Sequence, residues 1–259
     1  MWTIVESNVM GRVIMRLIKG HEGRLLGLAL LAVAFVAFAS PARAISSVTN
    51  ISNGGSVSYA DLVGTNVLSV QVGDKLFSNF TFQFLSTDMS LGNNVVPSDL
   101  AVSALFNQFG EGLSIQLVGF NVSNMNSQDI ALTFSAQVVG TGNLISGLDL
   151  SVNGGATVGG LADVSENVYT HGIGAGNIAN LAVAITSSSA SYAESVVTFA
   201  PQPIIYIEKD LGLSANAGGG CGTAFISIVN QTFAQVPEPS TIFLLAMGIT
   251  GLWVARRRK

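Results

Sequence analysis

The sequence predicts an all-β protein, an antiparallel β-sandwich that follows a cleaved N-terminal signal helix and precedes a single C-terminal transmembrane helix. Three observations lead to this prediction. Between residues 45 and 236, short segments alternate apolar with polar residues, which is typical of half-buried strands. Glycine-rich turn segments separate them at the spacing of a sandwich. An uncharged apolar run stands near each end, so we divide the chain into a signal peptide (1–44), a β-sandwich body (45–236) and a C-terminal tail (237–259).

Residues 1–44 have the parts of an export signal. Four basic residues between positions 12 and 24 precede an uncharged run at 25–39. Ala42 and Ala44 then place small side chains at both positions of a cleavage site. We expect the export translocon to take up this segment and signal peptidase to cleave it after Ala44. The run is shorter than the roughly 20 residues that span a bilayer, and an uncleaved anchor is the alternative.

The strand pattern of the body is clearest in residues 130–138, and it recurs in residues 76–84 and 113–122. In the last of these segments the apolar parity changes near Gly119, which predicts a β-bulge. Residues 223–233 supply a final strand that leads into the tail.

Turn residues separate these segments. Glycines in residues 72–74, 153–155 and 159–160 predict turns with positive φ. Residues 98–109 are the one candidate for a short helix. Many short strands with such turns predict two antiparallel sheets.

The charge of the body excludes one class of partner. Lys75 and Lys209 are its only basic residues, against twelve acidic ones. A chain this acidic does not neutralise a run of phosphates, so we expect no nucleic acid to bind. Few lysines also leave sheet edges unguarded, which favours self-association or binding to a polysaccharide; a monomer with covered edges is the alternative.

The body lacks the residues that common catalytic sites need. His171 is its only histidine, in a glycine-rich segment that predicts an exposed turn, and no nucleophile elbow occurs. Asp163 and Glu166 stand three apart, which places them on opposite faces of a strand. We interpret both as solvated surface charges and therefore expect no enzyme activity, no catalytic residue and no cofactor.

No metal site is predicted either. Asp149 with Asn153, or Asp61 with Asp74, offers oxygen ligands of the kind that calcium prefers, but no D-x-D-x-D loop is present. Cys221, the only cysteine, is interpreted as a small buried residue or an unreactive thiol, with pairing between molecules as the alternative.

The end of the chain has three parts in a fixed order. The first contains two prolines, which keep the backbone extended and unpaired, as a processing enzyme requires. The uncharged run at 241–255 follows and is about 22 Å long as a helix, most of the thickness of a bilayer core. A basic end then holds the helix on the cytoplasmic side. The sorting motif is Val236, Pro237, Glu238, Pro239 and Ser240, and the membrane stop is Arg256, Arg257, Arg258 and Lys259.

This order of Pro-Glu-Pro, short apolar helix and arginine cluster resembles the PEP-CTERM sorting signal of Gram-negative bacteria, over Pro237 to Lys259. The resemblance implies that an exosortase, a membrane-embedded transpeptidase-like enzyme, recognises and processes the tail. Residues 72–80 and 208–233 are similar to segments of other PEP-CTERM proteins, which implies a shared β-rich body.

We therefore expect an exported protein, first anchored in the inner membrane and then located in the envelope, on the outer surface or outside the cell. Its expected role is structural or adhesive, in an exopolysaccharide or biofilm matrix. A carbohydrate-binding module is the first alternative, although the body has no tryptophan to stack on sugars. A hydrolase of the envelope that uses Asp163 and Glu166 is the second.

Overall fold

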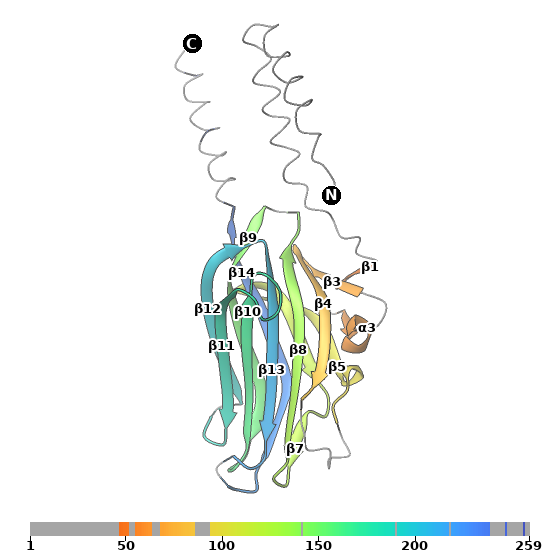
Figure 1. The fold of residues 1–259 in the computed structure, drawn as a ribbon, viewed down its shortest axis with the longest axis vertical. Helices are drawn as coiled ribbons and strands as arrows, with labels where there is room; N and C mark the ends of the chain where they lie inside the picture. The colour runs from red at the N-terminus through yellow and green to blue at the C-terminus, as the bar shows by residue number, and fades with distance from the viewer. Residues whose placement is uncertain are drawn as a thin grey trace, which may run out of the picture. The chain divides into compact units, whose positions relative to one another are not determined.

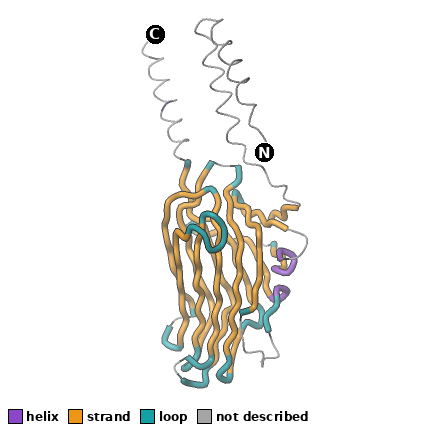
Figure 2. Tube along the Cα trace, viewed as in Figure 1, coloured by secondary structure: helices purple, strands orange, loops and turns teal. Residues whose placement is uncertain are grey.

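Strands make up nearly all of the body, as the alternating pattern predicts. The computed structural model describes residues 47–51, 55–63, 68–85, 94–140, 142–189, 191–217 and 219–238, together with Met247 and Arg256. Two β-sheets of seven strands each form the body (Figure 1). Most of the loops gather at the two ends of the strands (Figure 2). The predicted antiparallel β-sandwich is confirmed.

The first sheet has the strand order β1-β3-β4-β8-β13-β10-β11. β1 is parallel to β3, and all other neighbours in this sheet are antiparallel. Its strands are β1 (Ser47–Asn50), β3 (Leu68–Val72), β4 (Lys75–Phe84), β8 (Ser127–Val138), β10 (Leu161–Tyr169), β11 (Asn177–Thr186) and β13 (Ile204–Ser214).

The second sheet has the order β12-β9-β14-β6-β5-β2, and the short β7 also pairs with β14. All of its pairs are antiparallel. Its strands are β2 (Ser56–Ser58), β5 (Leu100–Asn107), β6 (Gly110–Leu117), β7 (Asn121–Ser123), β9 (Asn143–Ala156), β12 (Tyr192–Gln202) and β14 (Thr223–Pro237). The helical segments are α3 (Tyr59–Val63) and η1 (Pro97–Asp99).

One face of each sheet packs into a shared core, because side chains alternate along a strand. Every second residue of β13 from Ile205 to Leu213 is buried, for example. Aromatic side chains connect the two sheets: the ring of Phe77 on β4 lies 5.4 Å from that of Phe233 on β14. The strands predicted at residues 76–84, 130–138 and 223–233 are confirmed as β4, β8 and β14.

The helix predicted at residues 98–109 is wrong. A 3₁₀ turn at Pro97–Asp99 leads directly into β5. Leu100 and Val102 are both buried while Ala101 between them is half-buried, a two-residue period that fits a strand. Hydrogen bonding to β6 then fixes the strand.

The change of parity near Gly119 is a break between two strands, not the predicted bulge. β6 ends at Leu117 and β7 begins at Asn121, and both pair with successive parts of β14. Gly119 has a φ of 77°, which lets the chain step from one strand to the next.

The turn predicted at residues 153–155 is also wrong, because these residues lie inside β9. A Cβ at Gly154 would lie 2.3 Å from the backbone oxygen of Phe225, and one at Gly155 would lie 2.6 Å from the Phe225 ring. These glycines therefore permit a close approach of β14. The turns predicted at residues 72–74 and 159–160 are confirmed, with φ of 56° at Gly73 and 83° at Gly159.

The signal peptide with Ala42 and Ala44, and all of the apolar run at 241–255 except Met247, lie outside the described residues. So does the membrane stop, apart from Arg256. In the part of the chain that the structure describes, no helix has the length and apolar character needed to cross a membrane.

Candidate functional site

The sorting motif begins inside the fold, at the end of β14. Val236 is paired with Leu144 and Pro237 with Asn143, both on β9. The backbone N–H of Glu238 donates to the carbonyl oxygen of Gly142 at 2.9 Å. The backbone is extended here, as predicted, but the expectation that it is unpaired is wrong for residues 236–238. Pro239 and Ser240 lie outside the described residues.

β14 accommodates Pro237 because, at this position, the strand is hydrogen-bonded on the side of β9 only. Successive N–H groups of a strand point to opposite sides, and the N–H of Glu238 points to β9. The nitrogen of Pro237 therefore faces the side of β6, whose pairing with β14 has already ended at Phe233. No ladder hydrogen bond is lost at this proline.

A cluster of polar side chains holds β14 just before the motif. Gln235 Nε2 donates to both carboxylate oxygens of Asp74, at 3.0 and 3.1 Å. The same carboxylate is 3.0 Å from Lys75 Nζ, which is 3.4 Å from Glu111 Oε2. Lys75 is only 1% exposed. We call Asp74, Lys75, Glu111 and Gln235 the anchor cluster.

The geometry of the β3–β4 turn makes this cluster possible. A Cβ at Gly73 would overlap the carboxylate of Glu111, about 2.0 Å away. Without that Cβ, Glu111 Oε2 accepts from the backbone N–H of Asp74 at 3.0 Å. The anchor cluster thus joins a turn of the first sheet to β6 and β14 of the second.

A second polar group lies in the centre of the core. Lys209 Nζ donates to Glu166 Oε2 and to Gln231 Oε1. Lys209 and Gln231 are completely buried and Glu166 is 1% exposed. The interpretation of Glu166 as a solvated surface charge is therefore wrong, because its strand turns this side chain inward, where the single lysine of β13 meets it.

Burial dominates the ionisation of this group. It raises the pKa of Glu166 and lowers that of Lys209, although the attraction between the two charges opposes both changes. Sequence reasoning missed the group because its three members stand on three strands. The one available signal was a lysine in a segment whose alternate residues are apolar.

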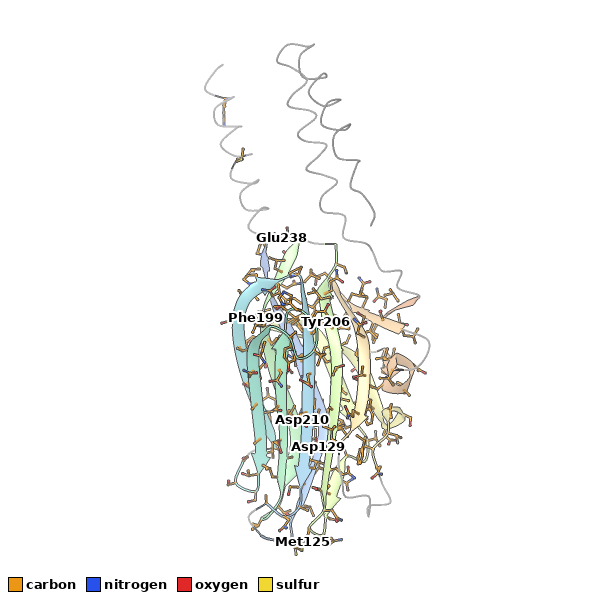
Figure 3. All side chains as sticks on the ribbon, viewed as in Figure 1. Met125, Asp129, Phe199, Tyr206, Asp210 and Glu238 are labelled. Carbon is orange, nitrogen blue, oxygen red and sulfur yellow. The ribbon has the colours of Figure 1, made fainter. Side chains whose placement is uncertain are left out.

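Asp163 lies on the outer face of β10, and its placement opposite to Glu166 is confirmed. Gly212 separates it from Asp129 across the sheet, and a Cβ there would lie 2.9 Å from Asp163 Oδ1. Asp210 is on the same face, close to Asp129 (Figure 3). Burial, the hydrogen bond with Asp210 and the charges of Asp210 and Asp163 raise the pKa of Asp129 to about 7.

Asp163 keeps part of its exposure but is not freely solvated. Burial and the charge of Asp210 raise its pKa. Because Asp163 and Glu166 occupy opposite faces of the sheet, the structure does not bring them together as an acid–base pair.

The remaining candidates are separate from these groups. His171 is exposed in the loop between β10 and β11, as predicted, with Nδ1 2.7 Å from Thr170 Oγ1. Cys221 is exposed, so its interpretation as a buried residue is wrong, and its interpretation as an unreactive thiol stays a prediction.

Two of the carboxylates considered for calcium, those of Asp149 and Asp74, already bind protein groups, although Asp149 Oδ1 has no hydrogen-bond partner among the described residues. Asp149 Oδ2 accepts from Asn107 Nδ2 at 3.2 Å and from Thr232 Oγ1 at 3.3 Å, and Asp74 binds Lys75 and Gln235. Among the described residues, no three or more His, Cys, Asp or Glu side chains form a group that would hold a metal ion.

Solved structures similar to this chain include carbohydrate-binding modules. The module TmCBM61, solved in complex with β-1,4-galactotriose, is 10% identical, with 60% of this chain and 88% of that chain covered and a TM-score of 0.30. A CBM4 structure is 10% identical, covering 61% and 86%, with a TM-score of 0.28. The CBM22-1 xylan-binding domain of Paenibacillus barcinonensis Xyn10C is 8% identical, covering 60% and 86%, with a TM-score of 0.25. No curated protein matches the sequence.

The family comparison concerns the end of the chain. Residues 235–259 match the model of the PEP-CTERM protein-sorting motif. The motif implies export, sorting at the cell envelope and an exosortase as the processing partner. The match begins at Gln235, the residue that β14 contributes to the anchor cluster. The chain thus carries a PEP-CTERM protein-sorting motif, in a match that spans residues 235–259.

Proposed function

We propose that the exported body is a non-enzymatic structural or adhesive module of the exopolysaccharide or biofilm matrix, and that it associates with further copies of itself. The exosortase would process the tail first. The observation that carries this proposal is the edge of the second sheet, which β12 forms.

β12 is eleven residues long and is hydrogen-bonded to β9 on one side. It stands at the end of the strand order of its sheet. Its outward side chains include Tyr192, 47% exposed, and Val196, 50% exposed. Glu194 is its only charged residue. Natural edge strands are usually protected by lysines, prolines or short length. β12 is long and nearly uncharged, and its one proline, Pro201, stands next to its last residue. The stretch from Tyr192 to Ala200 therefore favours pairing with another chain.

A charge on this edge tests the proposal. We expect Val196→Lys in the full chain to weaken self-association by about tenfold or more, because an ammonium on the edge opposes pairing. Sedimentation velocity of the purified protein measures this change, and recovery of the protein with the matrix shows its consequence. Val158→Lys is the control, because Val158 is 79% exposed in the turn before β10. Equal association of the two variants would refute a role for β12.

A specific observation also favours a carbohydrate-binding module. Tyr169 and the half-buried Tyr206 are paired across β10 and β13 on the outer face of the first sheet. Tyr169 is 8% exposed, and its hydroxyl donates to Glu208 Oε2 at 2.8 Å. Aromatic rings beside hydrogen-bonding groups form the usual lining of a ligand site. Saturable binding in a polysaccharide pull-down that Tyr206→Ala abolishes and Tyr192→Ala leaves intact would favour this second function.

A further inference from the structure

The buried group of Lys209, Glu166 and Gln231 joins the two sheets. Glu166 on β10 lies directly opposite Lys209 on β13 in the first sheet. Gln231 reaches Lys209 from β14 of the second sheet. The residues paired with these three in the flanking strands are all leucines, each at most 3% exposed: Leu113, Leu132, Leu150 and Leu181. Three polar side chains therefore meet in an otherwise apolar interior.

The hydrogen bonds of this group are incomplete. Lys209 Nζ serves one oxygen of Glu166 and the carbonyl oxygen of Gln231. Glu166 Oε1 and Gln231 Nε2 have no hydrogen-bond partner of good geometry within the described part of the chain, although Gln231 lies close enough to Glu166 to lower its pKa. Buried polar atoms without partners are costly, and a buried ion pair is a weak source of stability. The amide nitrogen of Gln231 is thus a buried donor without a well-placed acceptor.

We propose that Lys209 and Gln231 react to form an intramolecular amide cross-link, with Glu166 as the residue that transfers protons. The Nζ lone pair of Lys209 attacks Cδ of Gln231. The carbonyl oxygen Oε1 of Gln231 gains negative charge as this bond forms, and Glu166 protonates that oxygen. Glu166 then takes a proton from Nζ and passes it to Nε2. The Cδ–Nε2 bond breaks, ammonia leaves, and the carbonyl re-forms as Glu166 recovers its proton.

The atoms and electrons balance without a further reactant. One N–C bond forms, one N–C bond breaks, one molecule of ammonia is released, and Glu166 ends as it began. The product keeps a single amide N–H at position 209, which donates to Glu166. The unpartnered Nε2 is removed with the ammonia. The reaction thus eliminates both the buried ion pair and the unpartnered donor.

The ionisation of the group agrees with this chemistry. An amine is a nucleophile only in its neutral form, and a carboxyl group donates a proton only when protonated. Burial lowers the pKa of Lys209 and raises that of Glu166, which favours both of these forms. Water-excluding leucines on the flanking strands also protect the reacting groups from hydrolysis.

The cross-link would fix β13 of one sheet to β14 of the other, between residues 22 positions apart. β14 continues into the sorting motif at Val236 and Pro237. A covalent bond at Gln231 would therefore join the strand that leads to the tail to the centre of the body, and force on the tail would not separate the sheets there.

Peptide mapping of the purified full chain by mass spectrometry tests the proposal. We expect the peptides that contain Lys209 and Gln231 to be recovered as one joined species, lighter than their sum by one ammonia molecule. Separate peptides of full mass would overturn the proposal. A joined species lighter by one water molecule would also overturn it, because that loss would join Lys209 to Glu166.

Three variants test the assigned roles. Lys209→Arg keeps a buried cation but does not form the amide, and Glu166→Gln keeps the shape of the side chain but removes the proton carrier; we expect the joined species to be lost in both. Lys75→Arg is the matched control, because Lys75 is the other buried lysine, and we expect it to retain the joined species. A joined species in Glu166→Gln at the wild-type level would refute the role of Glu166.

Discussion

Replacing Gln235 by alanine should release the start of the sorting motif from the body. Gln235 is the side chain of the anchor cluster that β14 contributes, and its amide donates to both oxygens of Asp74. Beyond Phe233, β14 is paired on the side of β9 only. The segment from residue 234 to residue 238 therefore has fewer backbone partners than the rest of the strand and depends more on this side chain.

The size of the effect follows from these contacts. A hydrogen bond to a charged group contributes about 1.5–3 kcal/mol, and the lower value applies because the Asp74 side chain is 18% exposed. Because 1.4 kcal/mol corresponds to a factor of ten in an equilibrium constant, about 1.5 kcal/mol raises the open fraction of the segment about tenfold. The core strands are not disturbed, so the melting temperature should change little.

Hydrogen exchange at the Glu238 amide measures this opening, because that N–H bonds to Gly142 in the closed state. We expect its exchange to be about tenfold faster in Gln235→Ala. Gln202→Ala is the control, since the amide of Gln202 donates only to the nearby carbonyl of Ala200 at 3.1 Å. If Gln235→Ala exchanges at the same rate as the control, the anchor cluster does not hold the motif and the reasoning fails.

Three further predictions concern stability. The pKa of Asp129 is raised from 3.8 to about 7 in the folded state, so the folded protein binds more protons than the unfolded one between these values. Stability should therefore fall as pH rises through this window. Asp129→Asn should reduce that dependence in denaturation at a series of pH values, while Asp163, whose pKa is also raised, keeps part of it. Phe134 is 1% exposed, and Phe134→Ala should lower the free energy of unfolding by about 3–5 kcal/mol. Phe106 is 48% exposed, and Phe106→Ala should lower it far less. Equal losses of the two variants in urea titrations would contradict the assignment of the core. Gly112→Ala would place a Cβ 1.8 Å from the backbone oxygen of Gln231 and should cost about 2 kcal/mol or more, a loss that the same titration measures.

The sequence predicted the structure best where apolar and polar residues alternate without interruption, because this two-residue period is that of a strand. Residues 130–138 alternate without interruption, and β8 covers them. The helix predicted at 98–109 is wrong because the two-residue spacing of Leu100 and Val102 and the pairing with β6 make this segment a strand. Gly154 and Gly155 predict a turn when only the local sequence is considered. Their role in the structure is to admit Phe225 of β14, about seventy residues away in the sequence, and no local pattern reveals that contact.

The polar groups were harder to predict for the same reason. Opposite faces for Asp163 and Glu166 follow from strand geometry alone, but which face is buried depends on the neighbouring strands. Glu166 is inside because it shares a face of β10 with the buried Val164 and Val168, and there Lys209 lies opposite it on β13. The pairing of Val236 and Pro237 with β9 likewise depends on β14 continuing beyond its last contact with β6. A local reading of the prolines indicates only an extended backbone.

The contacts of the two lysines in the body show that both have a structural role. Both body lysines are buried, and each is linked to β14 through a glutamine: Lys209 directly through Gln231, and Lys75 through Asp74 to Gln235. A residue type selected only for solubility would lie on the surface. Here the two buried lysines tie the first sheet to the strand that carries the sorting motif. Changes at these lysines should therefore affect the C-terminal end of the body more than changes at exposed acidic residues do.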